Sequence, residues 1–196
     1  MNSGKQARTR SRPIGILGGS FDPVHHGHLR VAIEALTDGI SNTGTITGTT
    51  EISLRARAGD VYNNGTLSSP KIGLVSDTGN VWLPANITTS GSLIAQGRAV
   101  GVEGSITATT AITLVSTAYN VTAHSIMATK TLVIEAAQDL RTTAGRLRGS
   151  VVTQVIADDI ERTDIAETNR KLGAITGAAG DVHVQLRTGS LGTYTP

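Results

Sequence analysis

Cysteine is missing from this chain of 196 residues, and aromatic residues make up only 3% of it. Without cysteine there is no disulfide framework and no thiolate metal site. A globular core of this length normally uses more phenylalanine, tyrosine and tryptophan, because a ring covers a large area per residue. A core of isoleucine, valine, leucine and alanine, in a chain with 23 glycines, favours a regular stacked β-structure.

Strong net charge and long apolar runs are missing as well. The formal net charge is +2, and nothing in the chain forms the basic footprint of a nucleic-acid-binding protein, so no nucleic-acid partner is expected. No apolar run approaches the roughly 20 residues of a membrane span. The run at residues 14–17 is too short for the hydrophobic region of a signal peptide. We expect a cytoplasmic location for the chain as written, and a surface or extracellular one if the repeats belong to an exported parent.

The chain repeats itself from residue 41 onward. The block that begins at Val81 slips by one, so that Leu93 and Ala95 take the inward positions. A fixed period of about 20 residues with internal alternation predicts a mainly β fold, a parallel β-solenoid (β-helix). Apolar residues recur at one block position, again two residues later, and at the start of successive blocks: Ile52, Ile72, Ile112 and Leu132; Leu54, Leu74, Leu114 and Ile134; Val61, Val81 and Val121.

Stacking gives this repeat its core. Alternation sends Ile52 and Leu54 to one face of a strand, and a single coil cannot bury that face until others stack on it. Asp60, Asn80 and Asn120 close successive blocks, where Asx side chains can satisfy local backbone groups in a turn. Ile52, Ile72, Ile112 and Leu132 are therefore predicted to form one interior ladder.

The two ends of the chain differ from the repeat. We divide the sequence into a disordered basic tail (1–13), a short βα fragment (14–40), the solenoid (41–157) and a C-terminal cap and tail (158–196). The pattern weakens after about Arg141, and residues 158–170 are polar enough for a short helix or a cap. Stacked parallel coils leave unpaired edges, so an unknown surface or self-association through the solenoid ends is the expected interaction.

One sharp motif precedes the repeat: GGSFDPVHHGH at residues 18–28. It follows an apolar run at residues 14–17 and precedes a segment from His28 to Leu36 with apolar residues at helical spacing, which predicts a strand, a tight loop and a helix. Glycines after a strand let backbone N–H groups approach phosphate, and a helix beginning near His28 would add free N–H groups and a positive dipole end.

Residues 14–36 resemble the nicotinate-nucleotide adenylyltransferase family within the HxGH nucleotidyltransferases. The resemblance implies transfer of AMP from ATP to nicotinate mononucleotide in NAD biosynthesis, with Mg²⁺. By the same resemblance His25 and His28 would bind phosphate and stabilise the transition state. The residues that would shape the ATP-binding loop are Gly18, Gly19, Ser20, Phe21 and Gly27.

The rest of that enzyme has no counterpart in the sequence. A complete doubly wound sheet and a second nucleotide motif near the C-terminus are missing; Ile40-Ser41-Asn42-Thr43 echoes that motif without its arginine. We therefore expect an incomplete, inactive site, with a nucleotide-binding cap and an active adenylyltransferase of unusual build as alternatives. The solenoid itself requires no cofactor; ATP and Mg²⁺ belong to the chain only if the motif functions.

Residues 41–148 resemble the haemagglutinin-like repeats of large bacterial exoproteins. The segments NTGTI at 42–46, NNGTL at 63–67 and GSLIA at 91–95 carry this resemblance. It implies a structural or adhesive role. Weaker candidates are a Ca²⁺ site at Asp158, Asp159 and Glu161, for which a solvated cap is an alternative, and the sequon asparagines Asn86 and Asn120, which are more simply turn residues.

Overall fold

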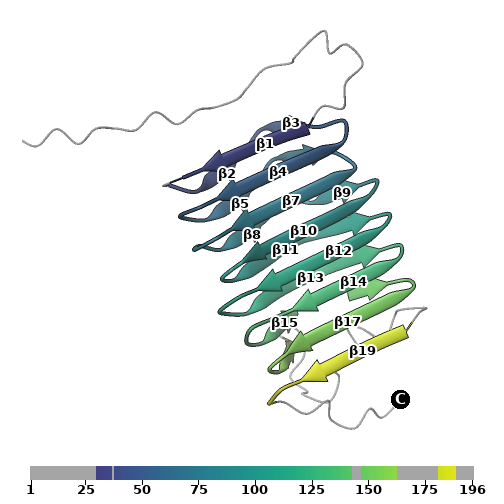
Figure 1. Cartoon of the computed structure of the whole chain (residues 1–196). Coiled ribbons are helices and arrows are strands. Elements are labelled where there is room, and N and C mark those ends of the chain that lie inside the picture. Colours follow the sequence, from purple (N-terminus) through teal and green to yellow (C-terminus); the bar gives the residue numbers. More distant parts are fainter. Residues whose placement is uncertain (1–29, 37, 143–146, 163–180, 189–196) are drawn as a thin grey trace, which may run out of the picture.

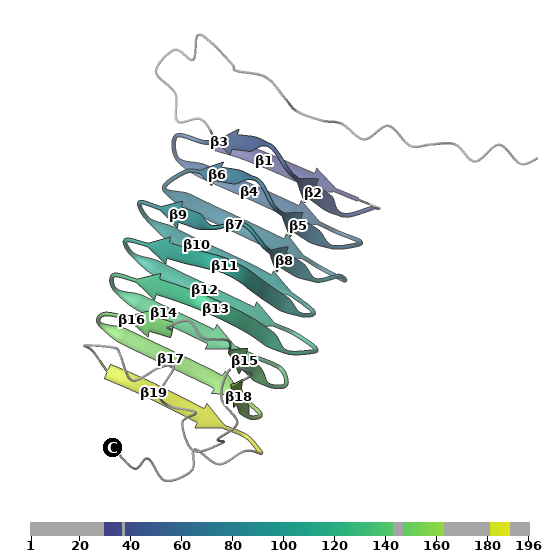
Figure 2. The ribbon, with the colours of Figure 1, turned by 180° about the vertical axis from the view of Figure 1, so that it is seen from behind.

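The computed structural model describes residues 30–36, 38–142, 147–162 and 181–188. Throughout these residues the chain runs as strands joined by tight turns, with no helix. The strands stack in parallel, coil upon coil, and Figures 1 and 2 show the resulting tube from opposite sides. The coils repeat about every 20 residues, which confirms the predicted parallel β-solenoid.

An eight-stranded parallel sheet forms one wall of the tube. Equivalent residues of successive coils pair in register, as in Ile52 with Ile72 and Ile112 with Leu132. The strands of this wall, in spatial order, are β1 (Arg30–Ala35), β4 (Glu51–Ala56), β7 (Lys71–Ser76), β10 (Ser92–Gly97), β12 (Ala111–Ser116), β14 (Thr131–Glu135), β17 (Val152–Ala157) and β19 (Asp181–Leu186).

The remaining strands form the opposite walls. Most belong to a nine-stranded sheet, and β3 and β6 form a small sheet of their own. These strands are β2 (Ile40–Asn42), β3 (Thr45–Thr47), β5 (Val61–Asn63), β6 (Thr66–Ser68), β8 (Val81–Leu83), β9 (Ile87–Thr89), β11 (Val100–Ala108), β13 (Val121–Ala128), β15 (Leu140–Thr142), β16 (Leu147–Gly149) and β18 (Ile160–Arg162).

The interior ladders lie where the repeat predicts them. Ile52, Ile72, Ile112 and Leu132 are buried and successive in register, and Leu93 fills the place between Ile72 and Ile112. The predicted one-residue slip at Val81 is thereby confirmed. The valines that open successive blocks form a second ladder on the other wall, which includes Val61, Val81, Val100 and Val121.

The core is built from aliphatic side chains. Buried isoleucine, leucine, valine and alanine fill the described tube, and no aromatic residue is among the buried core side chains. A coil of about 20 residues leaves little room between opposite walls, so branched aliphatic side chains that stack on their equivalents pack it well. At the corners, Gly39 and Gly59 turn the chain at φ values of 80° and 78°, which side-chain-bearing residues rarely adopt.

The helix predicted from His28 to Leu36 is wrong over the part that the structure describes. Residues 30–35 form strand β1, which pairs in parallel with β4, for example Ile33 with Leu54. Apolar residues at 29, 32, 33 and 36 fit a helical period, but Ile33 and Ala35 also fit the two-residue period of a strand. Pairing with the exposed edge of β4 satisfies the backbone of β1 and selects the second period.

The solenoid also continues past the point where the sequence repeat weakens. Strands β15 to β18 add to both walls, and β19 pairs with β17 along its whole length. Residues 160–162, expected in a polar helix or cap, are strand β18; residues 163–180 lie outside the described residues. The backbone still repeats here although the apolar sequence pattern does not. Thr153 occupies a core position that isoleucine or leucine holds in other coils.

Candidate functional site

The predicted nucleotide site falls outside the described residues. Residues 1–29 contain all the residues to which catalytic or ATP-binding roles were assigned, so those roles and the associated ATP and Mg²⁺ stay predictions. They are His25 and His28, with Gly18, Gly19, Ser20, Phe21 and Gly27.

One element of that site can be followed into the described chain. The prediction placed the N-terminus of a helix near His28, where free N–H groups would face phosphate. From Arg30 onward the chain is extended and its backbone groups pair with β4. The helical part of the expected phosphate cradle therefore has no counterpart in the described residues.

Two of the segments that carry the exoprotein resemblance, at residues 42–46 and 63–67, share a buried asparagine ladder formed by Asn42 and Asn63. Asn42 Nδ2 donates to Asn63 Oδ1 at 2.7 Å, and Asn63 Nδ2 donates to the carbonyl oxygen of Gly65 at 3.0 Å. Gly65 lies so close to the coil before it that a Cβ atom would come within 2.1 Å of the carbonyl oxygen of Gly44. This repeated Asn-x-Gly corner helps to pack the coils, since the buried Asn42 amide bonds to the next coil and the Asn63 amide bonds within its own corner.

Asx residues at the other corners also bond from coil to coil. Asp60 Oδ1 accepts from the backbone N–H of Asn80 at 2.7 Å, and Asn80 Oδ1 accepts from the N–H of Ala99 at 3.1 Å. The sequon asparagines do the same: Asn86 accepts from Ser105, and Asn120 accepts from Asp139. These residues lie between strands, where turn residues were expected, but their side chains bond to the next coil instead of to local backbone groups.

A surface cluster of opposite charges crosses the first coils. Arg55 Nε and Nη2 donate to the carboxylate of Asp77 at 3.1 Å each, and Arg57 donates to Glu34. The hydrogen bond from Arg57 to Glu34 raises the pKa of that guanidinium above its ordinary value. Both arginines are about half exposed, so the cluster is a solvated clamp across coils worth little stability.

The acidic pair near the C-terminus is engaged in the fold. Asp158 Oδ1 accepts from Arg187 Nη1 at 3.0 Å, and Asp159 Oδ1 accepts from the N–H of Ile160 at 2.7 Å. Among the described residues no group of three or more histidine, aspartate or glutamate side chains is placed to hold a metal ion. The geometry therefore assigns Asp158 and Asp159 to the last corner. The side chain of Glu161 lies outside the described residues, so Ca²⁺ at this place stays a prediction.

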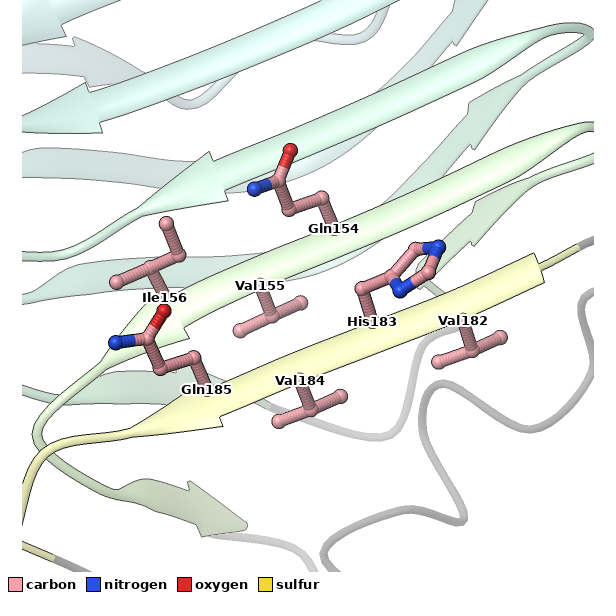
Figure 3. Close-up of a pocket in the computed structure, with 7 residues that line it drawn as sticks. All are labelled: Gln154, Val155, Ile156, Val182, His183, Val184 and Gln185. Carbon is pink, nitrogen blue, oxygen red and sulfur yellow. The ribbon is translucent and has the colours of Figure 1, made fainter.

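An open hollow lies over β17 and β19, the last two strands of the eight-stranded sheet, and few of its side chains are reactive. Figure 3 shows its side chains alternating across β17 and β19, with Gln154, Ile156, His183 and Gln185 on one face and the valines on the other. His183 is its single ionisable side chain. The lining residues are Gln154, Val155, Ile156, Val182, His183, Val184 and Gln185.

The sequence reasoning missed the aromatic residues of the outer surface. Trp82 lies across Gly101 of the next coil, where a Cβ atom would come within 2.1 Å of Trp82 Cε3. Tyr62 precedes Trp82 in register. Arg98 stacks over the Tyr119 ring at 4.8 Å and donates to its hydroxyl. The sequence did contain a signal for their outward position. In β5 and β8 inward and outward residues alternate, and Tyr62 and Trp82 each lie between two inward residues.

Comparison with known proteins finds likeness at the N-terminal end of the chain. A family model described as cytidylyltransferase-like matches residues 16–49. A "Probable nicotinate-nucleotide adenylyltransferase" of Aeromonas hydrophila subsp. hydrophila is 83% identical over 23 residues, which is 12% of this chain and 11% of that protein. A protein of the same description from Roseiflexus sp. (strain RS-1) is 71% identical over 24 residues, 12% of each chain. No solved structure matches.

These matches support the resemblance of the N-terminal stretch to nucleotidyltransferases. They do not extend beyond residue 49. The chain covers about an eighth or less of the length of these relatives. The matched family region continues to residue 49, across strands β1, β2 and β3 of the solenoid. The chain thus combines a short nucleotidyltransferase-like stretch with a β-solenoid, and part of the first is built into the second.

Proposed function

We propose that this chain is a structural, adhesin-like β-solenoid segment whose nucleotidyltransferase-like stretch forms no complete catalytic site. The observation that carries the proposal is the pairing of β1 with β4, residue by residue from Arg30 with Glu51 to Ala35 with Ala56. A segment held in that register cannot at the same time be the helix that an HxGH nucleotidyltransferase places after its motif.

The chemistry of the described surface supports a scaffold. Its polar corner groups bond to the next coil, its charges pair across coils, and the described residues gather no acid, base and nucleophile into one place. Such a rod presents a long regular surface, which suits contact with another surface. An extracellular location is part of this proposal if the segment belongs to an exported parent. In the described residues, no helix combines the length and the hydrophobicity that crossing a membrane requires.

Transfer of AMP from ATP to nicotinate mononucleotide is the second candidate, favoured by the matches at residues 16–49. Nucleotidyl transfer depends on holding two substrates in line, and positioning of this kind supplies roughly 7–11 kcal/mol when complete. His25 and His28 alone would gather phosphates without the opposing wall. Weak nucleotide binding is compatible with the scaffold role.

The test is release of pyrophosphate by the purified full chain with ATP, Mg²⁺ and nicotinate mononucleotide. We expect no turnover above a buffer blank. His25→Ala and His28→Ala are run in parallel. Turnover that disappears in both variants would make the chain an enzyme and overturn the proposal, whereas turnover that persists in both would identify a contaminant. Adhesion is tested separately, by binding of the folded chain to cell-surface preparations with Ile112→Asp as the unfolded control.

A further inference from the structure

The outer face of the eight-stranded sheet is unusually apolar for an exposed surface. Parallel sheets are commonly covered on both faces, and here one face lines the core. The other carries six branched aliphatic side chains at outward positions of neighbouring strands, which we call the apolar face. Ile94 is 48% exposed, and the rest are half-buried by their neighbours. The six are Val75, Ile94, Val115, Val133, Val152 and Ile156.

Charge is sparse on this face. Across the five strands β7, β10, β12, β14 and β17, the charged outward residues are Lys71 and Glu135. One strand further, β4 contributes Glu51 and Arg55. The register places Arg55, Val75, Gln96, Val115 and Glu135 in one row that runs along the tube. Arg55 and Glu135 therefore lie two strands to either side of β10.

We propose that the apolar face is the contact surface for a second copy of this chain, in a closed two-fold dimer. The two-fold axis would run along β10, so that the two strands β10 face each other and the coil order is reversed between copies. Val75 then faces Val115 of the other copy, and Ile94 faces its own equivalent. Such an isologous contact buries the same patch on both copies. Neither copy then has a free patch to which a third copy could bind, so the assembly stops at the dimer.

The charges fit this arrangement. The same axis sets Arg55 of one copy opposite Glu135 of the other, twice per dimer. Within the chain, the hydrogen bonds of Arg55 to Asp77 use Nε and Nη2, so Asp77 does not engage Nη1. Opposite charges at the two ends of the patch fix orientation and register more than they add affinity. They favour the reversed coil order over the alternative in which equivalent coils face each other.

Sedimentation velocity of the full chain across the micromolar range tests the proposal. We expect a reversible monomer–dimer equilibrium with no larger species. Ile94→Lys should raise the dissociation constant at least about tenfold, because it sets two ammonium groups against each other at the centre of the contact. Met127→Lys is the matched control, since Met127 is similarly exposed, at 44%, on the nine-stranded sheet. It should leave the equilibrium unchanged.

Charge reversal tests the orientation. Glu135→Arg should weaken the dimer, and Arg55→Glu combined with Glu135→Arg should restore at least part of the affinity. Because the chain lacks cysteine, Ile94→Cys gives a single thiol that a short bis-maleimide should join into covalent dimers, unlike Met127→Cys. A monomeric chain, open-ended growth with concentration, or equal loss in Ile94→Lys and Met127→Lys would overturn the proposal. Circular dichroism of each variant confirms that the solenoid is folded.

Discussion

The side-chain amide of Asn42 donates to Asn63 Oδ1 at 2.7 Å, inside the tube and one coil apart. Asn63 is fully buried, so removing its side chain leaves the Asn42 amide without that acceptor in a place that water reaches poorly. We expect Asn63→Ala to lower the free energy of unfolding by about 1–3 kcal/mol. Urea titration followed by circular dichroism measures this loss.

Asn64→Ala is the matched control, because Asn64 is the exposed neighbour and the chemical change is the same. It should move the free energy of unfolding by less than about 0.5 kcal/mol. An equal loss in both variants would mean that the asparagine ladder contributes nothing specific.

Trp82 gives a built-in optical probe, since the chain contains one tryptophan. Its ring covers Gly101, where a new Cβ atom would meet Trp82 Cε3 at 2.1 Å and Cζ3 at 2.2 Å. Gly101→Ala should push the ring toward water and shift the tryptophan emission to longer wavelength, with a loss of roughly 1 kcal/mol in stability.

Gly73→Ala is the control for that experiment. A Cβ atom at Gly73 has no heavy atom within 3.9 Å, and alanine suits a strand interior better than glycine. The emission maximum should stay where it is in the wild type. If Gly101→Ala leaves the emission unchanged as well, the ring does not lie across the glycine.

Ile112 stands in the middle of an interior ladder, between Leu93 and Leu132. Ile112→Asp buries a carboxylate without a partner, which costs several kcal/mol and is comparable with the whole stability of a domain. Loss of the cooperative thermal transition is the expected result. Thr107→Asp, at an outward position of β11, should keep the transition; if it does not, burial is not the cause.

The periodic part of the fold could be predicted from the sequence with little loss. Ladder residues such as Ile52 and Ile72 recur at fixed spacing, and each coil repeats the environment of the last, so one local pattern specifies every interior contact. The ends could not be predicted in the same way. Residues 30–35 fit two periods, and their choice of a strand depends on the free edge of β4, which is a tertiary effect that no local pattern contains. Thr153 interrupts the apolar pattern within the predicted solenoid; in the structure its hydroxyl bonds to Gly149.

For the candidate site, the local motif could be predicted from the sequence but its surroundings could not. The motif at residues 18–28 was readily identified because phosphate-binding loops use few residue types in a fixed order. The residues that surround the motif in space depend on the part of the chain that follows it. Here that part forms the first strands of the solenoid. The outer apolar face could not be predicted from the sequence, because Val75, Ile94 and Val115 belong to no motif. They form a continuous surface only once the register of the strands is known.

The conformation of Arg30–Ala35 distinguishes a solenoid from a nucleotidyltransferase most directly. Backbone NMR assignment of the full chain measures it through the Cα and Cβ secondary chemical shifts of these six residues. We expect extended values for all six and an amide contact between Ile33 of β1 and Leu54 of β4, which pair in register. A continuous run of helical values from residue 30 to residue 35 would contradict the assignment of this segment to the solenoid.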